Sequence, residues 1–336
     1  MIGSCLAKHY LENGHEVTVI DPGDLPRHRL TASLLEKLPG FYARGERLET
    51  MPLLDLHSLL KVTDVVIHAA AHTGIPHSIE DPTDDWVSNV EGTRKLLEAL
   101  RRKMKPIPTV VLSSVKPYAV GDLQVVPDRS GTRWRWADPT IHGIDEVWPM
   151  SPDEPYAASK LAQSAICQAY AKSYGLPIVT FRCSNLYGPA PCHGPRHGWA
   201  TWFAIAGVIE KPIRIEGTGL QVRDLLFWED VRSACDLAVE RVTECAGEIF
   251  NLGGAMTHTL SVREGADLLD TMLPVPLTRI PSEARKMDDP IFITNIMKFN
   301  KATGWWPKVK PQEGLLKVVD WAKKHKEELE TIYAGV

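Results

Sequence analysis

The sequence predicts an α/β protein with a doubly wound parallel sheet and a smaller C-terminal substrate-binding lobe. Short segments rich in apolar, β-branched residues, such as 62–68 (VTDVVIH) and 109–112 (TVVL), alternate in the first half with segments of helical periodicity. Such strands between helices are typical of a parallel sheet covered on both faces. The lobe is predicted by a change beyond about residue 188, where turns rich in Pro and Gly separate short segments.

The elements of the first half follow from apolar spacing and from glycines at helix ends. A helix over residues 4–13 is expected to end at Gly14 and one over 156–174 at Gly175, because glycine is the usual residue just after a helix. A third helix, over 89–100, has its leucines at helical spacing. Strands are expected at residues 15–20, 62–68, 109–112 and 177–181.

The second half predicts one more core strand and a lobe of mixed structure. Residues 248–252 fit a core strand, 188–197 a loop, 198–225 and 253–310 short strands with turns, and 314–330 a helix. We therefore predict a cofactor-binding core of residues 1–187 plus 226–252. Residues 188–225 plus 253–336 would form the substrate-binding lobe.

Composition and charge exclude several classes of function. A net charge of −4 with scattered Lys and Arg gives no sign of a nucleic-acid surface. No apolar run is long enough for a membrane span, and no secretory signal is visible, so a cytoplasmic protein is expected. The six cysteines are widely spaced and predict reduced thiols and no metal site. His193 and His197 lack a third ligand at useful spacing, so contact with solvent or substrate is expected of them.

The start of the chain contains part of a dinucleotide-binding unit. Gly3 stands before the first helix, where a glycine permits close packing of helix and strand and the helix N-terminus faces a pyrophosphate. Asp21 follows at the end of the next strand, near the spacing of an acidic residue that binds the adenosine ribose hydroxyls and disfavours a 2′-phosphate. These positions predict a Rossmann-like core that binds NAD. We also expect that a strand and two glycines precede Met1 in the natural protein.

Three residues have the chemistry of alcohol oxidation. Tyr156 and Lys160 are one turn apart on a predicted helix, so both side chains lie on one face. A tyrosine is a poor base at its ordinary pKa of about 10, and a neighbouring ammonium together with the positive nicotinamide ring would favour its phenolate form. Ser114, at the end of a predicted strand, would hydrogen-bond the reacting oxygen. We predict that Tyr156 is the base, assisted by Lys160 and Ser114.

Further motifs make a family resemblance specific. They are 68–71 (HAAA), 89–93 (NVEGT), 182–189 (RCSNLYGP), 221–224 (QVRD) with 229–231 (EDV), and 304–307 (GWWP). With the segments above, their order and spacing resemble the extended short-chain dehydrogenases, the NAD-dependent epimerase/dehydratase family, from residue 2 to about 325.

The resemblance implies roles for individual residues. Tyr156, Lys160 and Ser114 would be catalytic. The cofactor would be lined by Gly3, Asp21, Asp55, Leu56, Ala69, Ala70, Ala71, Asn89, Cys183 and the Tyr156/Lys160 pair. Ser114 and Asn185 would contact a nucleotide-linked sugar, and Arg223 would pair with its diphosphate, since a guanidinium suits phosphate oxygens. A homodimer is also common in this family.

The resemblance favours epimerisation among the family's reactions. Dehydratases have an acidic pair directly after the catalytic hydroxyl, where this chain has Val115 and Lys116. The long segment between Ser114 and Tyr156 is similar to that of CDP-tyvelose (CDP-paratose) 2-epimerases, although Ser114 replaces a threonine and Asn185 a serine. Its tryptophans could pack within the segment or clamp a nucleotide. A 4-epimerase, an NAD(P)H-dependent keto-sugar reductase and an NAD-binding protein without catalysis remain alternatives.

Overall fold

The computed structural model describes residues 1–335 with short gaps. The gaps are Asp24, Leu25, Gly74, Met104, Cys192, His193, Arg196, His197 and Lys286, and for residues 26–29 and 75–76 only the backbone is described. The expectations for His193 and His197 therefore lie outside the described residues. No helix of the described part is long and apolar enough to cross a membrane.

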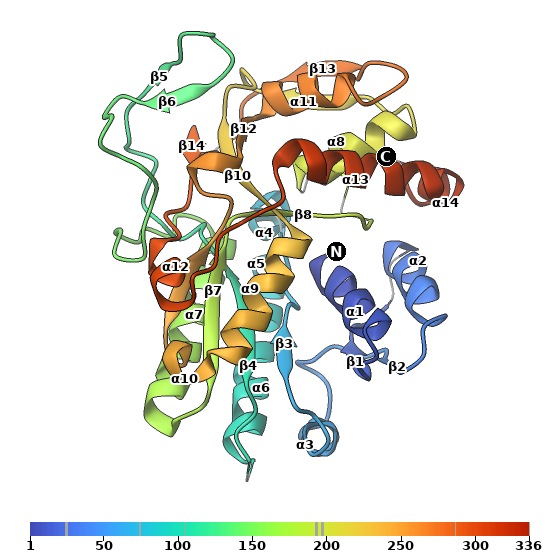
Figure 1. Ribbon diagram of the computed structural model, residues 1–336, viewed down its shortest axis with the longest axis vertical. Helices are drawn as coiled ribbons and strands as arrows, with labels where there is room; N and C mark the ends of the chain where they lie inside the picture. The colour runs from blue at the N-terminus through green and yellow to red at the C-terminus, as the bar shows by residue number, and fades with distance from the viewer. Residues whose placement is uncertain are drawn as a thin grey trace.

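A parallel four-stranded sheet forms the centre of the molecule (Figure 1). Its strands are β3 (Val66–His68), β4 (Thr109–Ser114), β7 (Ile178–Cys183) and β11 (Ile249–Leu252), in the order β11-β7-β4-β3. All residues of β4 and β7 are buried. The doubly wound α/β class is thus confirmed. The strand β3 is shorter than expected, because Val62 and Val65 are exposed and lie in the loop before it.

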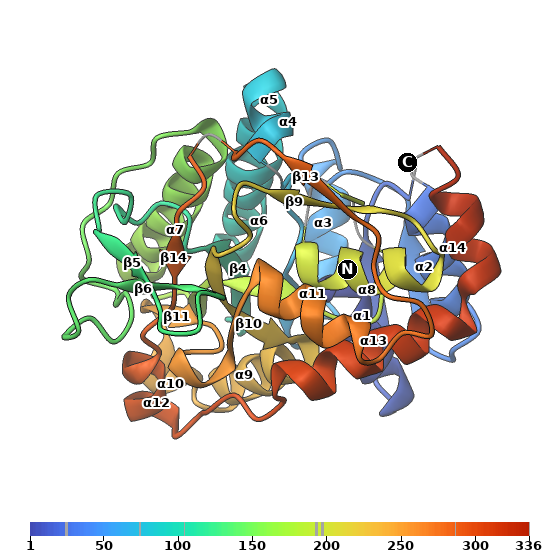
Figure 2. The ribbon, with the colours of Figure 1, turned by 90° about the horizontal axis from the view of Figure 1, so that it is seen from above.

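Helices cover both faces of this sheet (Figure 2). On one face lie α6 (Gly92–Arg101) and α7 (Pro155–Tyr174), and Val111 packs among their residues Leu97 and Cys167. On the other face lies α9 (Trp228–Glu240), against which Val110 and Leu112 pack. Because successive strand residues point to opposite faces, an apolar strand such as β4 contributes to both cores.

The N-terminal segment forms a separate parallel pair beside the main sheet. It comprises α1 (Ile2–Glu12), β1 (Val17–Ile20), α2 (Pro26–Leu35), β2 (Phe41–Arg44) and α3 (Leu53–Leu60). Within the described residues β1 pairs with β2, while β3 pairs with β4. The helix and strand predicted around Gly14 are confirmed, with Gly14 in the left-handed region at a φ of 83°.

A second sheet lies above the carboxyl ends of the main strands. It consists of β8 (Asn185–Tyr187), β10 (Val222–Phe227), β12 (Thr259–Ser261) and β14 (Ile291–Phe292), and β9 (Ile213–Glu216) pairs with β13 (Arg279–Ser282). The shorter helical elements are α4 (Ile75–Glu80), α5 (Pro82–Asp85), η1 (Trp86–Glu91), α10 (Val242–Cys245), η2 (Met256–His258), α11 (Val262–Asp270) and α12 (Met297–Thr303). The division into core and lobe by residue number remains a prediction, and β8 pairs with β10 rather than with β7.

Two expectations for the second half are wrong in detail. The segment expected as short strands begins with a helix, α8 (Trp199–Val208), whose residues are buried from Ala200 to Val208. A helix that is apolar all round has no periodic pattern to identify it. The C-terminal helix is interrupted at His325, which separates α13 (Pro311–Lys324) from α14 (Lys326–Ile332).

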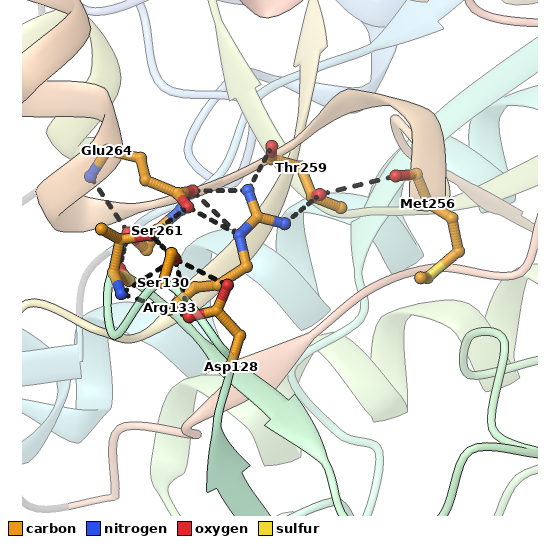
Figure 3. Close-up of polar contacts among 8 residues, drawn as sticks. Asp128, Ser130, Arg133, Met256, Thr259, Ser261 and Glu264 are labelled. Carbon is orange, nitrogen blue, oxygen red and sulfur yellow. Dashed lines mark hydrogen bonds and ion pairs between the residues drawn. The ribbon is translucent and has the colours of Figure 1, made fainter.

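The long segment between Ser114 and Tyr156 is a packed loop with a small hairpin, β5 (Val125–Pro127) and β6 (Trp134–Trp136). Trp136 is buried with Tyr118, Ile144 and Val222. At the hairpin turn, Arg133 Nε donates to Glu264 Oε1 over 2.8 Å and its Nη1 to Thr259 Oγ1 over 3.0 Å (Figure 3). The segment is therefore attached to the β12–α11 corner through polar contacts and to β10 through an apolar core.

Candidate active site

The candidate site lies at the carboxyl ends of β4 and β7, where a doubly wound sheet binds its ligands. Ser114 and Cys183 are the last residues of these strands and face each other in register. Both are buried. The Ser114 hydroxyl accepts a hydrogen bond of 3.1 Å from the backbone N–H of Lys116, so the turn after β4 fixes its place.

Tyr156 is in the first turn of α7, in contact with Ser114. Glu154 caps this helix by accepting from the N–H groups of Tyr156 and Ala157, and Ser78 Oγ accepts from the Tyr156 N–H over 2.8 Å. Burial raises the pKa of Tyr156, and its hydrogen bond with Ser114 is the contact that lowers it. Burial thus favours the protonated phenol, and the lowering expected of Lys160 together with the nicotinamide ring stays a prediction.

Lys160 lies one turn further along α7 and is fully buried. Its Nζ donates to the carbonyl oxygen of Leu112 over 3.1 Å and to Gln163 Oε1 over 2.5 Å, both neutral acceptors. Burial lowers the pKa of Lys160 to about 8, because the charged form loses its hydration. The sequence predicted that Ser114, Tyr156 and Lys160 converge, and the structure brings all three to one end of β4.

A buried polar network behind Lys160 was missed by the sequence analysis. Gln163 Nε2 donates to Thr93 Oγ1 over 2.9 Å, and Thr93 donates its own proton to the carbonyl oxygen of Asn89. His68 Nε2 lies 2.8 Å from the same Thr93 oxygen and must be its second donor, since the only Thr93 proton is already used. Burial lowers the pKa of His68 to about 3, so the ring is neutral. The HAAA and NVEGT motifs contained His68 and Thr93, but their contact with Gln163 depends on the tertiary fold.

Asn89 joins α7 to the loop that follows β3. Its Nδ2 donates to Ser159 Oγ over 2.9 Å and to the carbonyl oxygen of His72, while its Oδ1 accepts from the His72 N–H. Asn89 is completely buried. The structure therefore gives Asn89 a positioning role between Ala71–His72 and the residue that precedes Lys160.

The start of α1 shows whether the residues on the cofactor side fit a dinucleotide. A Cβ added at Gly3 would lie 3.6 Å from the Cβ of Ala69, so α1 begins directly against the loop of Ala69, Ala70 and Ala71. No side chain caps α1. Free amides at a helix N-terminus beside small side chains suit the phosphates of a dinucleotide. These residues fit the expected cofactor.

Three further cofactor residues differ in their surroundings. Asp21 Oδ1 accepts from the N–H of Gly23 over 2.9 Å, which forms a turn directly after β1. Asp55 is in the first turn of α3 and is exposed. Leu56 is only 1% exposed and packs among the leucines of α3 and α6, so its side chain serves the core. For Leu56 the cofactor role stays a prediction that its side chain does not support.

The substrate side is formed by β8 and β10. Asn185 begins β8 and pairs in register with Leu225. On the same strand as Leu225, Arg223 Nη2 donates to Asp288 Oδ1 over 2.6 Å. Gln221 Nε2 also reaches this carboxylate, over 3.2 Å. Arg223 is thus held in place by an acidic residue that the sequence analysis did not identify.

Comparisons with known proteins agree with this geometry. The model of the NAD dependent epimerase/dehydratase family matches residues 1–253. The chain is 32% identical to the CDP-paratose 2-epimerase of Salmonella typhi, over 95% of this chain and 96% of that protein. It is 26% identical to a dTDP-glucose 4,6-dehydratase of Neisseria meningitidis, over 95% and 90% of the two chains. The fold is similar to the crystal structure of UDP-glucuronic acid 4-epimerase from Bacillus cereus with UDP-glucuronic acid and NAD, with a TM-score of 0.79, 25% identity and 96% of each chain covered.

Proposed function

The chain belongs to the NAD-dependent epimerase/dehydratase family, and from this membership we propose that it is an epimerase of CDP-linked sugars that inverts carbon 2. It is an NAD-dependent enzyme that acts on nucleotide-linked sugars. The observation that carries the proposal is the convergence of Ser114, Tyr156 and Lys160 beside Cys183, at the edge of the sheet where the family binds NAD. The choice of CDP and of carbon 2 rests on the 32% identity to CDP-paratose 2-epimerase, which extends over nearly the whole of both chains.

The residues of the site divide the work of transient oxidation. Bound NAD supplies the hydride acceptor and, in the second half of the reaction, the donor. Tyr156 removes the proton of the sugar hydroxyl and later returns it. Ser114 holds the same hydroxyl, and the positive charge of Lys160 favours the phenolate form of Tyr156. The network from Gln163 to Thr93 and His68 keeps Lys160 oriented without a negative charge of its own.

The turn after Ser114 supports epimerisation over dehydration. A dehydratase needs a group that protonates the departing hydroxyl. Here Val115 is buried in an apolar core and Lys116 pairs with Asp289, so neither supplies a carboxylic acid. The buried acid nearest in sequence to Tyr156 is Glu154, and its oxygens are occupied by backbone N–H groups of α7.

The proposal also covers location and assembly. We place the enzyme in the cytoplasm, in accord with the free thiols of Cys5, Cys167, Cys183, Cys235 and Cys245. A homodimer that involves α7 is the expected assembly, and Tyr174 at the end of this helix is 53% exposed. Sedimentation equilibrium would distinguish a dimer from a monomer.

Product analysis tests the proposed reaction. Purified protein is incubated with NAD and a panel of CDP-, UDP-, dTDP- and GDP-sugars, and NMR identifies any inverted centre. We expect inversion at carbon 2 of a CDP-sugar with no net change in nicotinamide absorbance. Stoichiometric reduction of NAD would instead identify a keto-sugar reductase that runs in the reverse direction. Bound NAD without any turnover on the whole panel would identify a protein that has lost catalysis.

A further inference from the structure

Lys116 lies beside the catalytic hydroxyl and has no role in the proposed proton transfer. It is two residues after Ser114, and its backbone N–H donates to the Ser114 hydroxyl. Val115, between them, points into an apolar core with Tyr118 and Phe292. The turn that positions Ser114 therefore also fixes the position from which the Lys116 side chain extends.

The Lys116 ammonium is held by a short segment from the far end of the chain. Its Nζ donates to Asp289 Oδ2 and to the carbonyl oxygen of Met287, each over 2.9 Å. The side chains of Lys116 and Asp289 are 16% and 18% exposed. An ammonium has three N–H bonds, and this segment takes two of them.

The ammonium also faces the start of α7. Burial raises the pKa of the Glu154 carboxyl, and the charge of Lys116 is the first of the influences that lower it. Glu154 caps the helix at Tyr156. Lys116 thus lies between the residues 287–289 and the turn that presents the catalytic tyrosine.

The same segment holds the arginine expected to bind the diphosphate. Asp288 accepts from Arg223 over 2.6 Å, and the neighbouring Asp289 accepts from Lys116. One short segment, residues 287–289, therefore holds both cations. A sugar whose diphosphate is held by Arg223 and whose reacting hydroxyl is held by Ser114 would lie beside this segment, because Lys116 follows Ser114 by two residues.

We propose that the Lys116–Asp289 pair contacts the sugar and selects an uncharged hexose over a uronate. The inference rests on the proposed function and adds the chemistry of the sugar. Lys116 offers its remaining N–H to a sugar hydroxyl, while Asp289 cancels its charge, so no net positive charge awaits a carboxylate. The carboxylate of a uronate would lose its hydration there without gaining a free counter-charge, and burying an unpaired charge is costly.

Binding measurements on the NAD-loaded enzyme test this pair. Calorimetry gives the dissociation constants of CDP, CDP-glucose and CDP-glucuronate, two sugars that differ only at carbon 6. We expect CDP-glucose to bind at least about tenfold more tightly than CDP-glucuronate. Asp289→Asn is expected to reduce that ratio to about one by improving uronate binding. Lys116→Met is expected to weaken the binding of CDP-glucose about fivefold or more and to leave the dissociation constant of CDP unchanged.

Lys298 offers a matched control. Its Nζ also donates to one carboxylate, Glu248 over 2.7 Å, and to one backbone carbonyl, that of Ile249 over 2.8 Å, but on the edge strand β11. Lys298→Met should change none of the three dissociation constants. Unchanged CDP binding shows that each variant is folded.

Two outcomes would overturn the inference. One is equal affinity of the wild-type protein for both sugars, and the other is a preference for the neutral sugar that survives Asp289→Asn. If CDP itself does not bind, the nucleotide of the proposed function is wrong. The same ratios, measured with UDP-glucose and UDP-glucuronate, then still decide the role of the pair.

Discussion

Lys160 and Lys116 are two nearly buried lysines of one site whose partners differ in charge. Lys160, on the cofactor side, donates to the neutral oxygens of Leu112 and Gln163. Lys116, on the substrate side, donates to the carboxylate of Asp289. Arg223 and Arg133 resemble Lys116 in this respect, with Asp288 and Glu264 as partners. The positive charge on the cofactor side is uncompensated by its hydrogen-bond partners, and each of these three cations on the substrate side is balanced.

The difference has a physical meaning for the reaction. An uncompensated ammonium costs stability, because burial without a counter-charge disfavours its charged form. Its own hydrogen-bond partners carry no charge that would oppose its action on Tyr156, whereas the carboxylates of Glu154 and Asp85 raise the pKa of that tyrosine. Balanced pairs on the substrate side fix geometry and contribute little net field. We conclude that the fold tolerates an unfavourable charge where catalysis uses it.

Replacing Tyr156 is the largest expected change. Tyr156→Phe removes the group that takes the proton and retains the ring that fills its place. Turnover should fall by about 10³-fold or more, since positioned acid–base groups contribute about 10² to 10⁴. Initial rates measure turnover, and fluorescence titration should show unchanged binding of NAD. Variant turnover within a few fold of wild type would remove Tyr156 from the mechanism.

The uncompensated charge of Lys160 predicts a pH dependence of stability. The Lys160 pKa is about 8 in the folded protein, against an ordinary value of 10.5. The unfolded chain therefore binds more protons between these values, and the resulting penalty is full below pH 8 and is relieved as pH rises toward 10.5. From pH 7.5 to 9.5 Lys160 should add on the order of 2 kcal/mol to the free energy of unfolding.

Comparison with Lys160→Met isolates this contribution. Buried thiols such as Cys167, whose pKa is raised to about 12, act in the opposite direction at high pH in both proteins. Urea unfolding at several pH values should show that wild type gains stability relative to the variant as pH rises. A constant difference between the two proteins from pH 7.5 to 9.5 would contradict the lowered pKa.

The catalytic residues could be predicted because their signals are local. Tyr156 and Lys160 are one turn apart on a helix with a clear C-terminal glycine, and the structure confirms that helix within one residue. Ser114 ends an apolar strand, and β4 extends two residues beyond the expected end to include it. Short-range periodicity and strand ends are properties that a sequence displays directly.

The supporting contacts could not be predicted because they join distant segments. Gln163 contacts Thr93 across 70 residues, and Lys116 contacts Asp289 across 173. Nothing in the local pattern of either partner identifies the other. The apolar helix α8 was missed for a different reason, because burial on all sides removes the periodicity that marks a surface helix. The raised pKa of Tyr156 likewise depends on burial, which spacing does not reveal.

The balanced pair at Arg133 gives the smallest expected effect and tests the other half of the comparison. Arg133 contacts Glu264 and Thr259 with side chains that are mostly covered, so Arg133→Ala should lower the free energy of unfolding by about 1–2 kcal/mol. Arg94→Ala, which breaks a well-exposed pair between α6 and Glu91 at the end of η1, should cost no more than about 0.5 kcal/mol.

Arg133→Ala should also leave the cofactor side unaffected. The hairpin packs against β10 through Trp136 and Val222, one residue from Arg223, so a loosened hairpin should weaken CDP binding and not NAD binding. Hydrogen exchange should increase at residues 125–136 and stay unchanged in α7. If NAD binding or α7 protection falls as much as CDP binding, the two sides of the site are not independent. Lys160 and the balanced cations of the substrate side would then belong to one coupled network, and the comparison between the two sides would fail.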